Sequence, residues 1–196
     1  MFRDYVPLDF VMLQPRVPYA RPTQTLPETV TLDDSAVQVM TDFASTTAII
    51  ILPADTVDEA HSRMIQRGVR LLLVVDENRN VLGIVTATDI LGEKPVQAAV
   101  QRGAKRGEIQ VRDIMTPHER IEVLDLAAVR SARVGHVVAT LRKTGRQHAV
   151  VVERDNRGQQ VVRGLFSATQ IARQLGVSIQ TTEVARTFSE IEATLR

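Results

Sequence analysis

The sequence predicts an α/β protein built from two copies of one strand–helix–strand–strand–helix unit. The first observation is the stretch 71–91, where an apolar β-branched run, an acidic turn, a second run and a hydroxyl residue follow one another. This order is typical of a β-hairpin that leads into a helix. The second observation is that the same order returns once, at residues 149–171. An internal repeat indicates two related units rather than one large domain.

Composition supports a packed core and limits the possible partners. Hydrophobic residues make up 44% of the chain and aromatic residues 4%, so the core must be aliphatic. The formal net charge of +1 gives no general attraction to nucleic acid or an anionic membrane, and we expect neither as a partner. The absence of cysteine excludes disulfides and thiolate metal sites. No apolar run approaches the roughly 20 residues that span a bilayer, and the N-terminus lacks a signal-peptide pattern, so we expect a cytoplasmic protein.

Residues 1–33 are expected to form an extended N-terminal arm. This segment holds five of the eight prolines, which block regular helix and central strand. Its aromatic residues and Val11-Met12-Leu13 need a surface to cover them, either on the body of the protein or on a second protomer. A partly disordered tail is the alternative.

The first repeat is expected to span residues 34–100. Asp33-Asp34-Ser35 caps a short helix, and Ala48–Leu52 reads as a fully buried strand that Pro53 ends. Thr56 and Glu59 have the spacing of a capping box, which predicts a helix that ends at Gly68. The hairpin follows, and a second helix begins near Thr88.

A basic linker is expected at 101–110, and the second repeat at 111–176. In the second copy we predict a strand over 121–124, a helix over about 132–143 and a hairpin that begins near Gln147. The tail, 177–196, is predicted to end in an amphipathic helix, because its apolar residues recur at intervals of four, three and four. It either packs on the body or makes a dimer contact.

The residues at the end of the first hairpin have two possible interpretations, a ligand site or an ordinary helix cap. Gly83 would allow a ligand to approach the backbone closely, and a helix that starts near Thr88 presents free N–H groups and a positive dipole end. Asp89 has acceptors for a vicinal diol, and the Thr86 hydroxyl can serve a phosphate or ribose oxygen. The same residues are also an ordinary helix cap, which requires no ligand.

The repeated motifs resemble those of a known family. Gly83–Ile90 reads G-I-V-T-A-T-D-I and Gly164–Ile171 reads G-L-F-S-A-T-Q-I. Together with Met40-Thr41 and the helix entry at Pro53–Ala60, they resemble a tandem pair of CBS (cystathionine-β-synthase) domains, the Bateman module. The second copy departs from the pattern, since it lacks the Pro and Thr at its helix entry and has a longer hairpin. The resemblance implies two repeats packed sheet to sheet in a stand-alone CBS protein, which pairs as a homodimer.

Proteins of this family that the chain resembles hold an adenine nucleotide or adenosyl ligand between the repeats. The resemblance implies AMP, ADP, ATP or S-adenosylmethionine as a regulatory ligand and no catalytic cofactor. The expected residues of the first site are Asp89, Thr86, Thr47, Ala48, Leu71, Leu72 and Ile84. Those of the second site are Gln170, Ser167, Arg120, Ile121 and His148, next to Gln147. Because Gln170 carries no charge where the family has an acidic residue, we expect the first site to bind more tightly.

Phosphate selectivity is left open by the sequence. The basic residues His118, Arg120, Arg146 and Arg173 either balance a polyphosphate near the second cleft or are solvated surface residues. No pair of histidines has the spacing of a metal site, and no metal is expected. No catalytic motif is present, so we expect no enzyme. The predicted function is a sensor that signals by conformational change. The alternative is a dimeric scaffold that binds no nucleotide and works through its termini.

Overall fold

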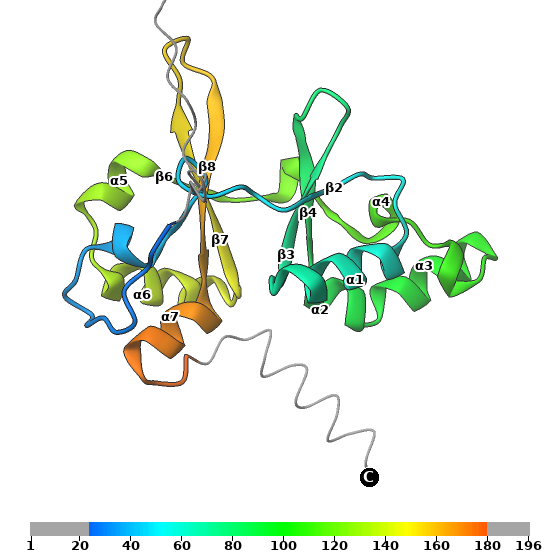
Figure 1. Ribbon diagram of the computed structural model, residues 1–196. Helices are drawn as coiled ribbons and strands as arrows, with labels where there is room; N and C mark the ends of the chain where they lie inside the picture. Colours follow the sequence, from blue (N-terminus) through cyan, green and yellow to red (C-terminus); the bar gives the residue numbers. More distant parts are fainter. Residues whose placement is uncertain (1–23, 180–196) are drawn as a thin grey trace, which may run out of the picture.

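The computed structural model describes residues 24–179. Within them the strands form two four-stranded sheets, which confirms the α/β class (Figure 1). The first 23 residues of the expected arm, and the predicted C-terminal helix, lie outside the described residues. The rest of the arm, 24–33, has no helix or strand and lies on the body of the protein, where Val30 is buried in the core of the second half.

The first sheet has the strand order β2-β3-β4-β5. Its strands are β2 (Ile50–Ile51), β3 (Leu71–Val75), β4 (Val81–Thr86) and β5 (Thr116–Pro117). β2 pairs with β3 in parallel, and β3 and β4 form the predicted antiparallel hairpin. The expected buried strand over 48–52 is wrong in its length and burial. Only Ile50 and Ile51 pair with β3, and because β2 is an edge strand with a single neighbour, Ile50 remains 38% exposed.

The second sheet has the order β1-β8-β7-β6. Its strands are β1 (Thr41–Asp42), β6 (Val123–Asp125), β7 (His148–Arg154) and β8 (Gln160–Ser167). β6 pairs with β7 in parallel and β7 with β8 in an antiparallel hairpin, as in the first sheet. The repeat seen in the sequence is therefore a repeat of topology.

Helices cover the outer side of each sheet, and the sheets face each other at the centre (Figure 1). The first half has α1 (Val57–Arg67), α2 (Ala87–Leu91), α3 (Lys94–Arg102) and α4 (Val111–Ile114). The second half has α5 (Leu126–Ser131), α6 (Val134–Thr144) and α7 (Ala168–Leu175). Three short 3-10 helices complete the fold: η1 (Ala36–Val39), η2 (Arg106–Glu108) and η3 (His118–Arg120). None of the described helices is long and apolar enough to cross a membrane.

Helix boundaries follow the caps that the sequence predicts. Thr56 caps α1 with a complete capping box, since its side chain accepts from the Glu59 N–H and the Glu59 carboxylate accepts from the Thr56 N–H. Gly68 ends this helix in the left-handed conformation, with φ of 64°. The linker expected at 101–110 is not a separate segment. Residues 101–102 end α3, and Ile109 is fully buried in the first core, although the basic residues between them are exposed.

β3 explains how the two sheets pack. All five of its residues are buried, because alternate side chains face different layers. Leu72 and Val74 point to the helices of the first half. Leu71, Leu73 and Val75 form a separate cluster with partly buried residues of both sheets, including Val162 and Leu165 of β8. This cluster confirms the sheet-to-sheet packing.

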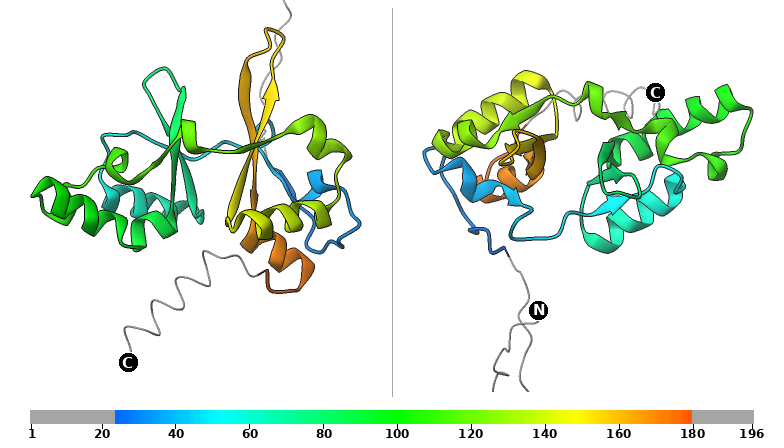
Figure 2. Two further views of the ribbon diagram at one scale, coloured as in Figure 1. Left: turned by 180° about the vertical axis from the view of Figure 1, so that it is seen from behind. Right: turned by 90° about the horizontal axis from the view of Figure 1, so that it is seen from above.

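Two segments cross between the halves, one in each direction. β1 lies on the second sheet although the strand that follows it, β2, lies on the first, so residues 43–49 cross over. In the same way β5 lies on the first sheet and β6 on the second, so residues 118–122 cross back. We call 43–49 and 118–122 the crossing segments; they run on opposite sides of the molecule (Figure 2).

The repeated glycines allow these crossovers. A Cβ atom built on Gly83 would lie 2.4 Å from the Thr116 carbonyl oxygen, and one on Gly164 would lie 2.7 Å from the Thr41 carbonyl oxygen. These glycines pack closely against β5 and β1 respectively. The expected close approach at Gly83 is real, but its partner is a strand of this chain rather than a ligand.

Candidate functional site

Two cavities lie at the places where the crossing segments meet the starts of α2 and α7. The first, of about 500 Å³, has three carboxylates and three cations in its lining. We call it the mixed-charge cleft; its charged residues are Asp89, Glu93, Glu122, Lys94, Arg120 and Arg146. The second, of about 430 Å³, is the arginine-lined cleft, named for Arg67, Arg70 and Arg173. None of the described residues that line the arginine-lined cleft is acidic. Both volumes are in the range of small-molecule sites.

The predicted site residues are divided between the clefts differently from the expected grouping. Asp89, Thr86 and Ile84 line the mixed-charge cleft, together with Arg120 and Ile121 of the other predicted set. Ser167 and Gln170 line the arginine-lined cleft, together with Thr47 and Leu71. The crossing segments cause this exchange, since each brings residues of one repeat to the helix start of the other.

Two of the residues expected at the first site take other positions. Leu72 is fully buried against the helices of the first half, so its side chain cannot form a wall of either cleft. Ala48 packs in the cluster between the sheets and lines neither cavity. The apolar residues that do line the arginine-lined cleft include Ile49, Val69 and Leu73, which the sequence did not indicate.

Asp89 already has partners within the chain. Its Oδ2 accepts hydrogen bonds from the Thr86 N–H at 2.8 Å and from the Thr86 hydroxyl at 2.7 Å, and the Asp89 N–H donates back to Thr86 Oγ1. Its Oδ1 forms an ion pair with the Lys94 ammonium group. Thr86 and Asp89 thus form a capping box at the start of α2, as the second interpretation of these residues predicts. A ligand diol would have to share these oxygens or displace Lys94.

Cations dominate the arginine-lined cleft. Arg70 Nη1 donates to Thr169 Oγ1 at 3.2 Å, which connects the start of β3 to the first turn of α7. Among the described residues, Arg67 and Arg173 have no side-chain hydrogen bond or ion pair, and all three arginines are exposed. Arg67 and Arg70 were missed by sequence analysis. They flank Gly68 between a helix and a strand, a position with no motif of its own.

Hydroxyl groups and a helix start complete this cleft. Ser167 caps α7, where its Oγ accepts from the Gln170 N–H at 3.5 Å. The free N–H groups of a helix start attract negatively charged ligand atoms. Thr46 and Thr47 of the first crossing segment add hydroxyl-bearing residues to the lining. Guanidinium and hydroxyl donors above an apolar floor suit a ligand with phosphates and a flat base.

His148 lies between the clefts and lines both. The pKa of this imidazole is lowered from 6.5 to about 4, mainly by burial and also by the positive charge of Arg70, while Asp89 acts in the opposite direction. His148 is therefore neutral near pH 7. No group of three described His, Cys, Asp or Glu side chains is arranged to hold a metal ion.

Comparison with known proteins identifies the first repeat. The family model for the CBS domain matches residues 39–95. Residues 39–95 are a CBS domain. No curated protein sequence matches the chain. The second half of the chain repeats the strand order of this CBS domain, with two helices, α5 and α6, where the first half has α1, so the fold is that of a CBS pair.

Solved structures share this fold at low identity. An uncharacterized conserved protein from Pyrococcus horikoshii is 20% identical with a TM-score of 0.51, over 72% of this chain and 92% of its own. The CBS domain pair of protein MJ0100, in complex with methylthioadenosine and S-adenosyl-L-methionine, is 22% identical with a TM-score of 0.51, over 74% and 97%. CBSX2 in complex with AMP is 21% identical with a TM-score of 0.50, over 71% and 94%.

Proposed function

We propose that this CBS pair is a regulatory module that binds an adenine nucleotide or adenosyl compound between its repeats and signals by a change in conformation. One observation carries the proposal: three arginines converge on a cleft of about 430 Å³ that contains no described carboxylate. The AMP and S-adenosylmethionine complexes of proteins with this fold support the class of ligand.

Charge favours the arginine-lined cleft for phosphorylated ligands. Its lining has three guanidinium groups and a neutral His148, so a ligand without phosphates would leave the like charges unbalanced. Guanidinium–phosphate pairs are charge-assisted and often bidentate, and each contributes about 1.5–3 kcal/mol. We place the phosphates near Arg67 and Arg173, and the ribose near Gln170.

The mixed-charge cleft favours a different ligand. Its three carboxylates offset its three cations, and Glu122 already pairs with Arg146 at 3.0 Å. A polyphosphate would have to overcome the repulsion of Asp89 and Glu93. An adenosyl compound with a positive centre, such as S-adenosylmethionine, suits this lining better. For phosphorylated ligands we therefore propose an order of affinity opposite to the one that the sequence motif indicates.

Signalling follows from the position of the clefts. Residues from both repeats line each cleft, so a ligand that contacts both favours the conformation in which the contacts are best made. The binding free energy is then coupled to the relative position of the halves. We include the homodimer in the proposal, as a unit that reports this change to a protein partner.

Calorimetry tests the proposal. The protein is purified under denaturing conditions and refolded, to remove bound ligand, and then titrated with AMP, ADP, ATP and S-adenosylmethionine. We expect ATP to bind, with affinity reduced about tenfold, or about 1.4 kcal/mol, in each of Arg67→Ala and Arg173→Ala. Asp89→Asn should change ATP affinity less than threefold.

Two results would contradict this proposal in different ways. Loss of ATP binding in Asp89→Asn, with the arginine variants unaffected, would move the nucleotide to the mixed-charge cleft. No binding of any of the four ligands by refolded protein would favour the dimeric scaffold that acts through its termini.

A further inference from the structure

A chain of hydrogen bonds leads from the arginine-lined cleft to the N-terminal segment. Gln170, in the lining of the cleft, donates through Nε2 to Gln174 Oε1 at 3.4 Å. Gln174 in turn donates through Nε2 to the Pro27 carbonyl oxygen at 2.7 Å. The Val30 N–H donates to the Gln174 carbonyl oxygen at 3.0 Å. Gln174 therefore connects α7 to residues 24–30, which we call the N-terminal strap.

Gln174 is unusual in its burial. The residue is 3% exposed. Among the described residues, no other polar or charged residue is buried. A buried amide is costly unless its donors and acceptors are satisfied. Here its acceptor is satisfied by Gln170 and one donor by Pro27, so the two contacts depend on the same side-chain orientation.

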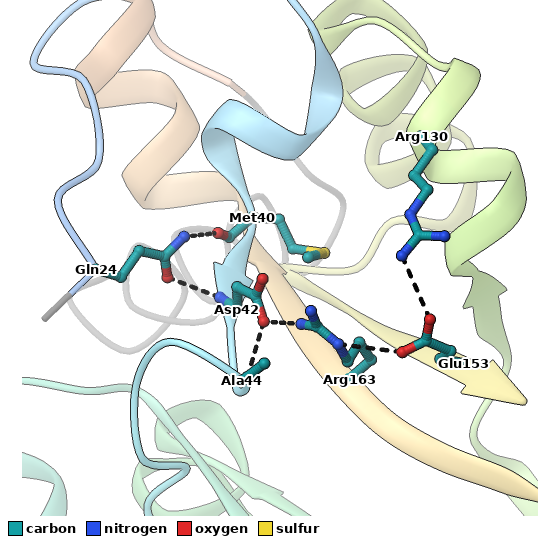
Figure 3. Close-up of polar contacts among 7 residues, drawn as sticks. All are labelled: Gln24, Met40, Asp42, Ala44, Arg130, Glu153 and Arg163. Carbon is teal, nitrogen blue, oxygen red and sulfur yellow. Dashed lines mark hydrogen bonds and ion pairs between the residues drawn. The ribbon is translucent and has the colours of Figure 1, made fainter. Parts of the chain in front are cut away.

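A second connection joins the strap to the opposite wall of the cleft. The Gln24 side chain donates to the Met40 carbonyl oxygen and accepts from the Asp42 N–H, both at 2.7 Å (Figure 3). The Asp42 carbonyl oxygen then accepts from the N–H groups of Ser45 and Thr46, at the beginning of the crossing segment that carries Thr46 and Thr47 to the cleft.

Arg163 strengthens this second connection. Its guanidinium group pairs with the Asp42 carboxylate and with Glu153 (Figure 3). Its carbonyl oxygen accepts from the Phe43 N–H at 2.9 Å. The Asp42 Oδ1 also accepts from the Ala44 N–H. The first crossing segment is thus held by groups that the strap contacts directly.

The connection through Gln174 gives a physical reason for the amide at position 170. A carboxylate there has only acceptors and would face Gln174 Oε1 without a donor between them. Gln174 would have to turn its amide nitrogen toward position 170 and give up Pro27. An amide can donate to Gln174 and still accept from a ligand hydroxyl.

We infer that Gln174 is a positioning residue that couples the Gln170 side chain in the cleft to the N-terminal strap, so that the strap is an output of the cleft. The ligand-dependent part of this inference rests on the proposed function. A ligand oxygen that accepts from Gln170 competes with Gln174 Oε1, whose bond at 3.4 Å is long. The buried acceptor then loses its partner, and the strap loosens. Because coupling is reciprocal, a loosened strap increases ligand affinity by the same factor.

Hydrogen exchange of the unliganded protein tests the coupling without a ligand. Gln170→Glu keeps the size of the side chain and removes its donor. We expect it to accelerate exchange of the Val30 amide at least threefold, and Gln174→Met to do the same. The matched control is Gln66→Glu, on the exposed face of α1. Amides of β3 should keep their rates in all variants, which separates local release from global unfolding. An unchanged Val30 rate in Gln170→Glu would overturn the inference.

Titration with ATP then tests whether Gln174 couples the cleft to the N-terminal strap or only stabilises the fold. Val30→Ala weakens the packing of the strap at a buried residue that lines neither cleft, and we expect it to raise ATP affinity about threefold in the natural background and not at all in Gln174→Met. Equal effects in both backgrounds would show that Gln174 only supports the fold. If ATP binds and the Val30 amide responds neither to ATP nor to Gln170→Glu, the proposed function stands and this inference fails. If no ligand binds but Gln170→Glu releases the strap, the coupling stands and the proposed function fails.

Discussion

Replacing Gly83 with alanine should destabilise the protein by detaching β5 from the first sheet. The new Cβ would lie 2.4 Å from the Thr116 carbonyl oxygen and 3.2 Å from the Pro117 Cα, and both are backbone atoms that cannot rotate away. Gly83 pairs with Pro117 in the β4–β5 ladder, so the strand must move as a unit. Overpacking of this kind costs about 1–3 kcal/mol. The reduced entropy of the unfolded chain offsets about 0.4–1 kcal/mol of it.

Urea unfolding followed by circular dichroism measures this loss. Gly107→Ala is the matched control, because nothing lies within 4 Å of a Cβ at Gly107 and its φ is not positive. It should be neutral or stabilise the protein by up to about 1 kcal/mol. The two variants should therefore differ by at least about 1 kcal/mol in the free energy of unfolding. Equal stability of Gly83→Ala and Gly107→Ala would refute the argument that close approach of β5 requires the glycine.

Three further predictions follow from individual side chains. Between pH 6.5 and about 4 the unfolded state binds a proton at His148 that the folded state does not, so the free energy of unfolding should fall with acidification by up to about 3 kcal/mol. In urea titrations over this pH range, the free energy of unfolding of His148→Gln should depend less steeply on pH. An equal pH dependence in both proteins would contradict the lowered pKa of His148. Thr56→Ala removes the capping box of α1 and should lower the free energy of unfolding by about 1 kcal/mol, whereas Thr144→Ala, near the exposed end of α6, should cost less. In a double-mutant cycle, Asp42→Asn and Arg163→Gln should show a coupling energy of about 0.5–3 kcal/mol, and strictly additive effects would mean that the pair does not hold β1.

The elements within each repeat could be predicted because their signals are local. The capping box at Thr56, the stop at Gly68 and the two hairpins depend on residues close in sequence, and the structure contains all of them. The edge strands were harder to predict from the sequence. Nothing in a two-residue strand such as Thr41–Asp42 states which of two similar sheets it will join.

The structure divides the predicted site residues between the clefts differently from the sequence for the same reason. Thr47 was assigned to the site of Asp89, because both belong to the first repeat in the sequence. The crossing segment instead takes Thr47 to the cleft of Gln170. The arginines at 67 and 70 carry no motif, and only the fold brings them to Arg173. The residues at the starts of α2 and α7 could therefore be identified from the sequence, but the residues that join them in each cleft could be found only from the positions of β1 and β5.

The crossovers have a consequence for fragments of this protein. A chain cut between Gly103 and Ala104 would yield two pieces, each carrying the edge strand that completes the sheet of the other. Either piece alone would expose buried side chains, Val39 and Met40 in one and Ile109 and Ile114 in the other. The separated pieces should therefore be poorly folded alone and regain their structure when mixed in equal amounts. Each piece would then supply the edge strand that the sheet of the other piece needs in order to fold.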